Sequence, residues 1–163
     1  MNDTQNEKSW DTLYEKYPDL FINRHKSPME SCMSFGIECG LGWYELLASV
    51  CWRIYQHEQN IERRKRVLKD QPEKIKEELE YFPVKFDQIK EKFGGLRFYY
   101  EGGDDYISGL VSMAESWADV ACEQCGGIGK RRGGGWVRTL CDQHEAEHEA
   151  RQEKYAKENG LEL

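Results

Sequence analysis

The chain contains 163 residues, 39% of them apolar and 12% aromatic, which is enough for one domain with a buried core. It has no apolar run of the roughly 18 residues that a transmembrane helix needs, and its first residues lack the apolar segment of a signal peptide, so we expect a cytoplasmic protein. The formal net charge of −7 disfavours unspecific binding to nucleic acids, because association with a polyanion needs a positive field.

Helical periodicity dominates the first half of the chain. Residues 9–17 place their large apolar side chains on one face of a short helix, with Ser9 as its N-cap. Apolar residues then recur at helical spacing and predict a long amphipathic helix over 43–69. A second, charged helical stretch is predicted over 72–82, between two prolines.

Residues 84–101 predict a β-hairpin. Apolar and polar side chains alternate in its second half, and Gly94–Gly95 supplies a two-residue turn. A turn centred on these glycines places Lys92 opposite Arg97. A further helix, capped by an aspartate and running over 104–121, is predicted to lead directly into the first cysteine pair.

Two short pairs of cysteine and histidine predict a metal centre. Cys122 and Cys125 form the first pair, and Cys141 and His144 the second. Each spacing aims two donors at one point, and three thiolates with one imidazole fill the four positions of a tetrahedral zinc ion. We therefore predict a structural Zn²⁺ with no open catalytic position. His148, one helical turn after His144, is an alternative fourth ligand.

The predicted architecture is a small, helix-rich α+β domain with a β-hairpin and a C-terminal annex that resembles a zinc ribbon or knuckle. We expect the α+β domain over 1–121, the zinc-binding annex over 122–145 and a charged C-terminal helix over 146–163. This last helix has almost no apolar face, so it should project from the body or pack against a partner. The sequence leaves undecided whether Cys32 and Cys39 bind a second metal ion.

Three segments carry residues suited to an anionic ligand. The glycine-rich turn 36–43 precedes a helix, where unpaired backbone N–H groups favour anions. The hairpin and the annex loop add cationic and stacking side chains. The candidate ligand-binding residues are Gly40, Gly42, Trp43, Lys90, Lys92, Arg97, Tyr99, Arg131, Arg132 and Trp136. No nucleophile–base pair or hydrolytic motif accompanies them, so we expect a binding protein and not an enzyme.

Three sequence motifs follow one another along the chain. They are Gly-Ile-Glu-Cys-Gly-x-Gly-Trp at 36–43, Lys-Glu-Lys-Phe-Gly-Gly-Leu-Arg-Phe-Tyr at 90–99, and Cys-x-x-Cys-Gly with Gly-Trp-x-Arg-Thr-Leu-Cys-Asp-x-His over 122–144. Together they resemble a family of small phage and prophage proteins, over roughly residues 18–145. The resemblance implies a phage accessory protein that acts in the host cytoplasm, and such proteins often counter host antiviral defence.

These observations together predict a protein that binds and sequesters a phosphorylated, nucleotide-like immune signal. Sequestration needs a preorganised site and no chemistry. In this interpretation Lys90, Lys92 and Arg97 neutralise phosphate, while Trp43 or Tyr99 stacks on a base.

Two alternatives stay open. One is a zinc-containing nucleic-acid-binding or transcription-linked protein that contacts phosphates through the basic residues 63–66 and 131–132. Nucleic acid is the less favoured partner because of the net charge. The other is a protein–protein inhibitor of a host factor that acts through its charged C-terminal helix. A homo-oligomer is compatible with every interpretation.

Overall fold

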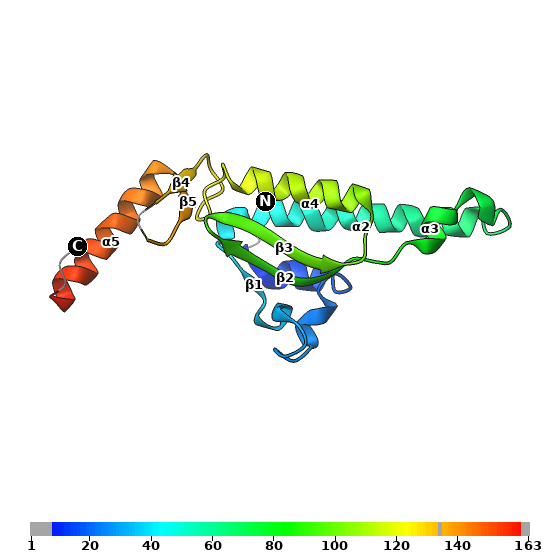
Figure 1. Ribbon diagram of the computed structural model, residues 1–163, viewed down its shortest axis with the longest axis horizontal. Coiled ribbons are helices and arrows are strands. Elements are labelled where there is room, and N and C mark those ends of the chain that lie inside the picture. The colour runs from blue at the N-terminus through cyan, green and yellow to red at the C-terminus, as the bar shows by residue number, and fades with distance from the viewer. Residues whose placement is uncertain (1–7, 134, 161–163) are drawn as a thin grey trace, which may run out of the picture.

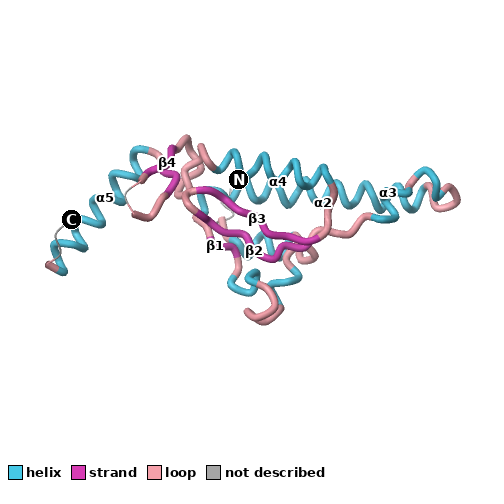
Figure 2. Tube along the Cα trace, viewed as in Figure 1, coloured by secondary structure: helices cyan, strands magenta, loops and turns pink. Residues whose placement is uncertain are grey.

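The computed structural model describes residues 8–133 and 135–160. The α-helices are α1 (Trp10–Lys16), α2 (Tyr44–Val67), α3 (Lys76–Glu80), α4 (Asp105–Ala118) and α5 (Asp142–Asn159). The strands are β1 (Ile37–Glu38), β2 (Lys85–Lys92), β3 (Gly95–Glu101), β4 (Lys130–Arg132) and β5 (Arg138–Leu140). Short 3₁₀ turns are η1 (Ile22–His25), η2 (Cys32–Phe35), η3 (Leu41–Trp43) and η4 (Pro72–Lys74). The mixed, helix-rich α+β fold with a hairpin is confirmed (Figure 2).

Two small sheets organise the strands. The first has the order β1-β2-β3, with β1 parallel and β3 antiparallel to β2, and the second is the antiparallel pair β4-β5. A register shift in β2 lies at Asp87, whose carboxylate accepts a 2.8 Å hydrogen bond from Asn23 Nδ2. This contact ties the first sheet to the segment that follows α1.

The turn of the β2–β3 hairpin lies one residue earlier than its glycine pair predicts. Lys92 pairs with Gly95, so the two turn residues are Phe93 and Gly94, and both have positive φ, at 54° and 78°. A two-residue turn with two positive φ values matches the twist of the strands it joins. Lys90, and not Lys92, therefore lies opposite Arg97. The predicted pairing was wrong.

The predicted helices form with the expected caps. Ser9 Oγ accepts a hydrogen bond from Asp11 N at 3.3 Å, and Asp104 Oδ1 accepts one from Ile107 N at 3.1 Å. Such caps satisfy N–H groups that the first helical turn leaves unpaired. The long helix and the helix that enters the metal centre therefore match their predicted ranges within a few residues. The charged stretch after Pro72 is shorter than predicted, being divided between η4 and α3.

The body of the molecule is a layer of helices over the three-stranded sheet. Helices α2 and α4 lie side by side, and β3 runs along α4 (Figure 1). One continuous apolar core joins them to α1, and its largest fully buried side chains include Trp43, Phe21 and Phe86. On the other face of the sheet, Lys92 and Tyr99 are exposed, and Lys90 and Arg97 are half-buried. Helix α3 lies at one end of this body.

The β4–β5 pair lies at the opposite end, and α5 projects away from it (Figure 1). Arg132 donates a hydrogen bond to Leu140 O and one to the Asp142 carboxylate, which joins β4 to the first turn of α5. The remaining length of α5 extends beyond the body, as its lack of an apolar face predicts. In the described part of the chain, every helix is too short or too polar to cross a lipid bilayer.

Candidate functional site

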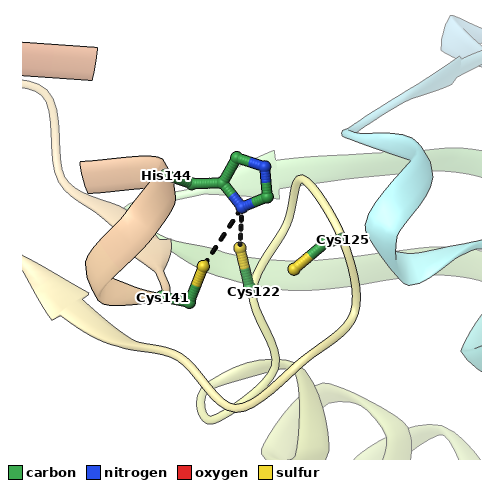
Figure 3. A group of neighbouring side chains, drawn as sticks. All are labelled: Cys122, Cys125, Cys141 and His144. Carbon is green, nitrogen blue, oxygen red and sulfur yellow. Dashed lines mark hydrogen bonds between the residues drawn. The ribbon is translucent and has the colours of Figure 1, made fainter. Parts of the chain in front are cut away.

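The four predicted metal ligands converge at the junction between the body and α5. Cys122 and Cys125 lie in the turn after α4, Cys141 immediately precedes α5, and His144 lies in its first turn (Figure 3). Their donor atoms all lie within 4.8 Å of one another. His144 Nδ1 is 3.1 Å from Cys141 Sγ and 3.5 Å from Cys122 Sγ. Metal–donor distances of about 2.0–2.3 Å give a tetrahedron with edges of roughly 3.3–3.8 Å, so the four donors are close enough to share one metal ion after small shifts of their side chains.

The local backbone prepares Cys122 to act as a thiolate. Burial raises the pKa of the Cys122 thiol. Hydrogen bonds from the backbone N–H groups of Cys141, Cys125 and Gln124 lower it, and their combined effect is the larger one, so the pKa lies below its ordinary value. The turn itself is closed by hydrogen bonds from Gly126 N to Cys122 O and from Cys122 N to Gly127 O, each 2.7 Å long. The fold thus holds the two cysteines of this turn in place without a metal ion.

The other candidate ligands lie elsewhere. The His148 ring contacts Arg138 Nη1 at 3.1 Å and takes no part in the metal cluster. Cys51 is buried in the core, Cys39 is half-buried and Cys32 is exposed. Within residues 8–133 and 135–160, the Cys122–His144 group is the one cluster with metal-ligand geometry, and it includes neither Cys32 nor Cys39.

The glycine-rich turn lies directly against the metal-binding turn. Gly40 N donates to Glu123 Oε1 and Gly42 N donates to Glu123 O, both at 2.8 Å. A Cβ on Gly42 would lie 2.5 Å from Cys122 O, so another residue would push the two turns apart. The pKa of Glu123 lies above its ordinary value, because burial raises it by more than the hydrogen bond from Gly40 N lowers it. The two N–H groups expected to meet a phosphate are therefore already paired with Glu123.

Trp43 is also part of this docking. Its side chain is fully buried, and its Nε1 donates a 2.8 Å hydrogen bond to Ala121 O, immediately before the metal-binding turn. A buried indole cannot stack on a ligand base, so the expected stacking role of Trp43 was wrong. The 36–43 motif instead anchors the annex to the body.

The hairpin tip meets the annex loop and encloses a pocket. Thr139 Oγ1 donates to Gly94 O at 2.6 Å, and Trp136 Nε1 donates to Glu91 Oε2 at 3.2 Å. The pocket between the two loops has a volume of about 320 Å³. Its lining consists of Lys90, Glu91, Lys92, Phe93, Gly135, Trp136 and Val137. Three predicted ligand-binding residues, Lys90, Lys92 and Trp136, thus come together from two segments of the chain.

A second group of predicted residues lies on the face of the sheet that is away from the apolar core. Lys90 is paired across the strands with Arg97, and its Nζ lies 5.4 Å from the centre of the Tyr99 ring. The position of a Cβ on Gly95 lies 3.0 Å from Arg97 Nη1, 3.0 Å from Asp119 Oδ1 and 3.4 Å from Arg131 Nη2, so two guanidinium groups and one carboxylate lie beside the start of β3. Lys90 belongs to both groups, so the pocket and this cationic face are continuous.

The basic residues of the annex are mostly paired. Arg131 Nη2 lies 3.4 Å from Asp119 Oδ1, and Arg132 forms an ion pair with Asp142. The side chain of Arg132 is largely covered, and its contacts connect β4 to α5. We therefore assign Arg132 to the annex structure, while Arg131 stays near the cationic face.

Two further residues line the pocket, Phe93 and Glu91, and neither is among the ligand-binding residues predicted from the sequence. Phe93 lies in the turn because Ile89 pairs with Phe98, and the sequence alone offers Tyr100 as an equally suitable partner for Ile89. Phe93 is 68% exposed at the pocket rim and has a positive φ that is rare outside glycine and asparagine.

A larger cleft of about 660 Å³ lies between α2, α3 and the start of α4. In it, His57 Nε2 lies 2.7 Å from Asp104 Oδ2, and the His57 ring stacks on Tyr106. Among the described lining residues, none is a serine, threonine, cysteine or lysine that this histidine could activate. The pair therefore joins α2 to the N-terminus of α4.

The sequence matches no protein-family model, and no curated protein or solved structure is significantly similar to the chain. Functional inference therefore rests on the geometry of the metal cluster and of the adjoining pocket.

Proposed function

We propose that this protein is a zinc-stabilised binding protein for a phosphorylated, nucleotide-like small molecule. The observation that carries the proposal is the pocket between the hairpin tip and the annex loop, where two lysines lie beside two exposed aromatic side chains. Its volume of about 320 Å³ falls at the lower end of the range for small-molecule sites.

Zinc is the metal that this donor set favours. Three cysteine thiolates and one imidazole form a common structural zinc site, and they leave no position for a water or a substrate. Residues Cys122, Cys125, Cys141 and His144 would hold the ion, which would supply a rigid cross-link between the end of α4 and the start of α5. The reaction chemistry of a hydrolytic zinc site does not fit this arrangement.

The pocket residues divide the recognition of such a ligand between them. Phe93 and Trp136 offer aromatic surfaces for a base, and Lys90 and Lys92 offer charge for phosphate. Trp136 is 71% exposed yet hydrogen-bonded to Glu91, so its indole is positioned without being buried. A phosphate that extends from the pocket along the sheet would next meet Arg97.

The biological role that fits these properties is sequestration of a nucleotide immune signal. It follows from the resemblance to small phage proteins together with a binding site that lacks a catalytic group among its described lining residues. In this role the protein lowers the free concentration of the signal in the host cytoplasm and so counters antiviral defence.

Nucleic-acid binding receives less support. Arg64 is paired with Glu78, and Lys65 Nζ lies 2.8 Å from Glu62. Together with the pairing of Arg131 and Arg132, these contacts neutralise much of both basic runs. The projecting α5 supports the alternative of an inhibitory contact with a host protein, and deletion of residues 146–163 would test it separately.

Calorimetric titration with a defined set of probes tests the proposal. We would titrate the metal-loaded protein with ATP, cyclic AMP, cyclic di-AMP and cyclic di-GMP. We expect at least one probe to bind, and both Trp136→Ala and Lys92→Gln to weaken its binding more than tenfold. Failure of all four probes to bind in the micromolar range would contradict the proposal.

Two control variants show whether a loss of probe binding comes from the pocket or from the removal of any exposed tryptophan or lysine. Trp52→Ala removes another exposed tryptophan, and Lys85→Gln removes another exposed lysine of the same strand. Both should bind the probe like the unmodified protein. Equal losses in these controls would show that the binding does not depend on the pocket.

A further inference from the structure

The outer face of α4 carries a row of large apolar side chains in solvent. Tyr106, Met113 and Trp117 follow one another at spacings of seven and four residues, which places them on one side of the helix, and Val120 lies in the turn that follows α4. Each is about half exposed or more, with Met113 at 71% and Trp117 at 59%. We call these four residues the α4 stripe.

The α4 stripe is unusual in its lack of charge. Between Asp105 and Asp119 the one charged residue is Glu115, and its carboxylate accepts a 2.9 Å hydrogen bond from Phe98 N on β3. Across the whole chain, 33% of residues are charged. An exposed helix face with apolar residues and no charged side chain is typical of an interface.

A glycine in the middle of α4 points to close contact. Gly109 lies on the same outer face, one helical turn before Met113. Apart from neighbouring backbone, no described atom lies within 4 Å of the position that its Cβ would take. Glycine is a weak helix former, and here the packing of the described chain does not require it. Because Gly109 has no side chain, it leaves a notch on the helix surface, and a side chain of another molecule would fit into this notch.

We propose that the α4 stripe is the interface of a homodimer, in which α4 packs antiparallel against α4 of a second copy. A two-fold axis at Met113 makes the surface self-complementary, as an isologous dimer requires. Residues equally far before and after Met113 then face each other, so Tyr106 meets Val120 of the other copy and Trp117 meets Gly109. The large indole thereby enters the glycine notch.

The area of the α4 stripe is large enough for a specific interface with a second copy of the chain. Tyrosine and tryptophan each offer about 150–250 Å² when fully buried, so the half-exposed stripe represents on the order of 500 Å² per chain. Two copies would bury roughly 1,000 Å², the lower limit for a specific interface. At the C-terminal end, Asp119 is partly neutralised by Arg131 at 3.4 Å, which reduces repulsion between the copies. A reversible dimer is therefore expected.

Sedimentation velocity over a range of concentrations tests the dimer. The chain mass is 19.2 kDa, and we expect the measured mass to approach twice that value between about 1 and 200 µM, the range of a modest affinity. Met113→Glu should raise the dissociation constant more than tenfold, because it places like charges together at the two-fold axis. A mass of 19.2 kDa at every concentration would overturn the proposal.

Two variants show whether this face is the one used. Gly109→Ala fills the notch, so it should weaken the dimer while raising the melting temperature of the dilute monomer, since alanine favours helix. Trp52→Glu introduces a charge beside the α1–α2 contact, away from α4, and should leave the dimer unchanged. A dimer that survives Met113→Glu, or that Trp52→Glu abolishes equally, would place the interface elsewhere.

Discussion

At the scale of single residues, Phe93 connects strain with function. It occupies the first position of a tight turn with φ of 54°, where asparagine or glycine is favoured. Its side chain is largely exposed and makes no large contribution to the core. A bulky residue in an unfavourable conformation on the surface points to a role other than stability, and we propose that this role is ligand binding in the adjoining pocket.

Replacement of Phe93 should therefore separate stability from binding. Phe93→Asn removes the strain of a left-handed phenylalanine, and we expect the free energy of unfolding to rise by about 1 kcal/mol. Thermal unfolding would show this as an increase of about 3 °C. The same variant should bind the nucleotide probe less tightly.

Phe82→Asn is the matched control, because Phe82 is 74% exposed and lacks a positive φ. It should produce no gain in melting temperature and no loss of binding. A Phe93→Asn protein that melts at a lower temperature than the unmodified chain would contradict the strain argument.

Individual residues differ in how far the sequence predicts them. The Cys/His cluster could be predicted because the spacing of its four residues is typical of a shared metal site, and the structure brings their donor atoms within 4.8 Å of one another. Trp43 could not be assigned, because a tryptophan after a glycine-rich turn suits both a stacking platform and a core anchor. Its burial depends on Ala121, which lies 78 residues away in the sequence.

At the scale of elements, periodicity predicted the helices and the hairpin, while register and docking required the structure. A glycine pair indicates a turn but does not decide which of the two neighbouring registers forms. The structure places Ile89 opposite the buried Phe98, whereas a turn centred on the two glycines would place it opposite Tyr100, which lies on the same face and is less buried. Lys90 and Arg97 become neighbours as a consequence.

The close contact between the glycine-rich turn and the metal-binding turn predicts that a side chain at Gly42 destabilises the protein. Gly42→Ala places a methyl group 2.5 Å from backbone atoms of the metal-binding turn, so one of the two turns must move. We expect the free energy of unfolding to fall by about 1–3 kcal/mol, the usual cost of overpacking. Chemical denaturation with the metal bound measures it.

Gly133→Ala is the control for that variant, because no described atom lies within 4 Å of its Cβ position. It should change the free energy of unfolding by no more than about 0.5 kcal/mol. If Gly42→Ala were equally harmless, the annex would not rest on the 36–43 turn in the way described.

At the scale of the whole molecule, the Cys122–His144 cluster lies where three parts meet. Its residues come from the end of α4 and the start of α5, the turn that contains Cys122 and Cys125 rests on the 36–43 segment, and the annex loop reaches the hairpin tip. One wall of the pocket belongs to the body and the other, with Trp136, belongs to the annex. The pocket should therefore exist only while the annex is held in place.

Native mass spectrometry with and without a metal chelator tests this dependence of the pocket on the metal. For the untreated protein we predict one zinc ion per chain and retention of the nucleotide probe that calorimetry identifies. After chelation we predict loss of the zinc and of the probe together, because the annex wall is no longer fixed. A protein purified without zinc, or one that retains the probe equally well after the metal is removed, would contradict the account.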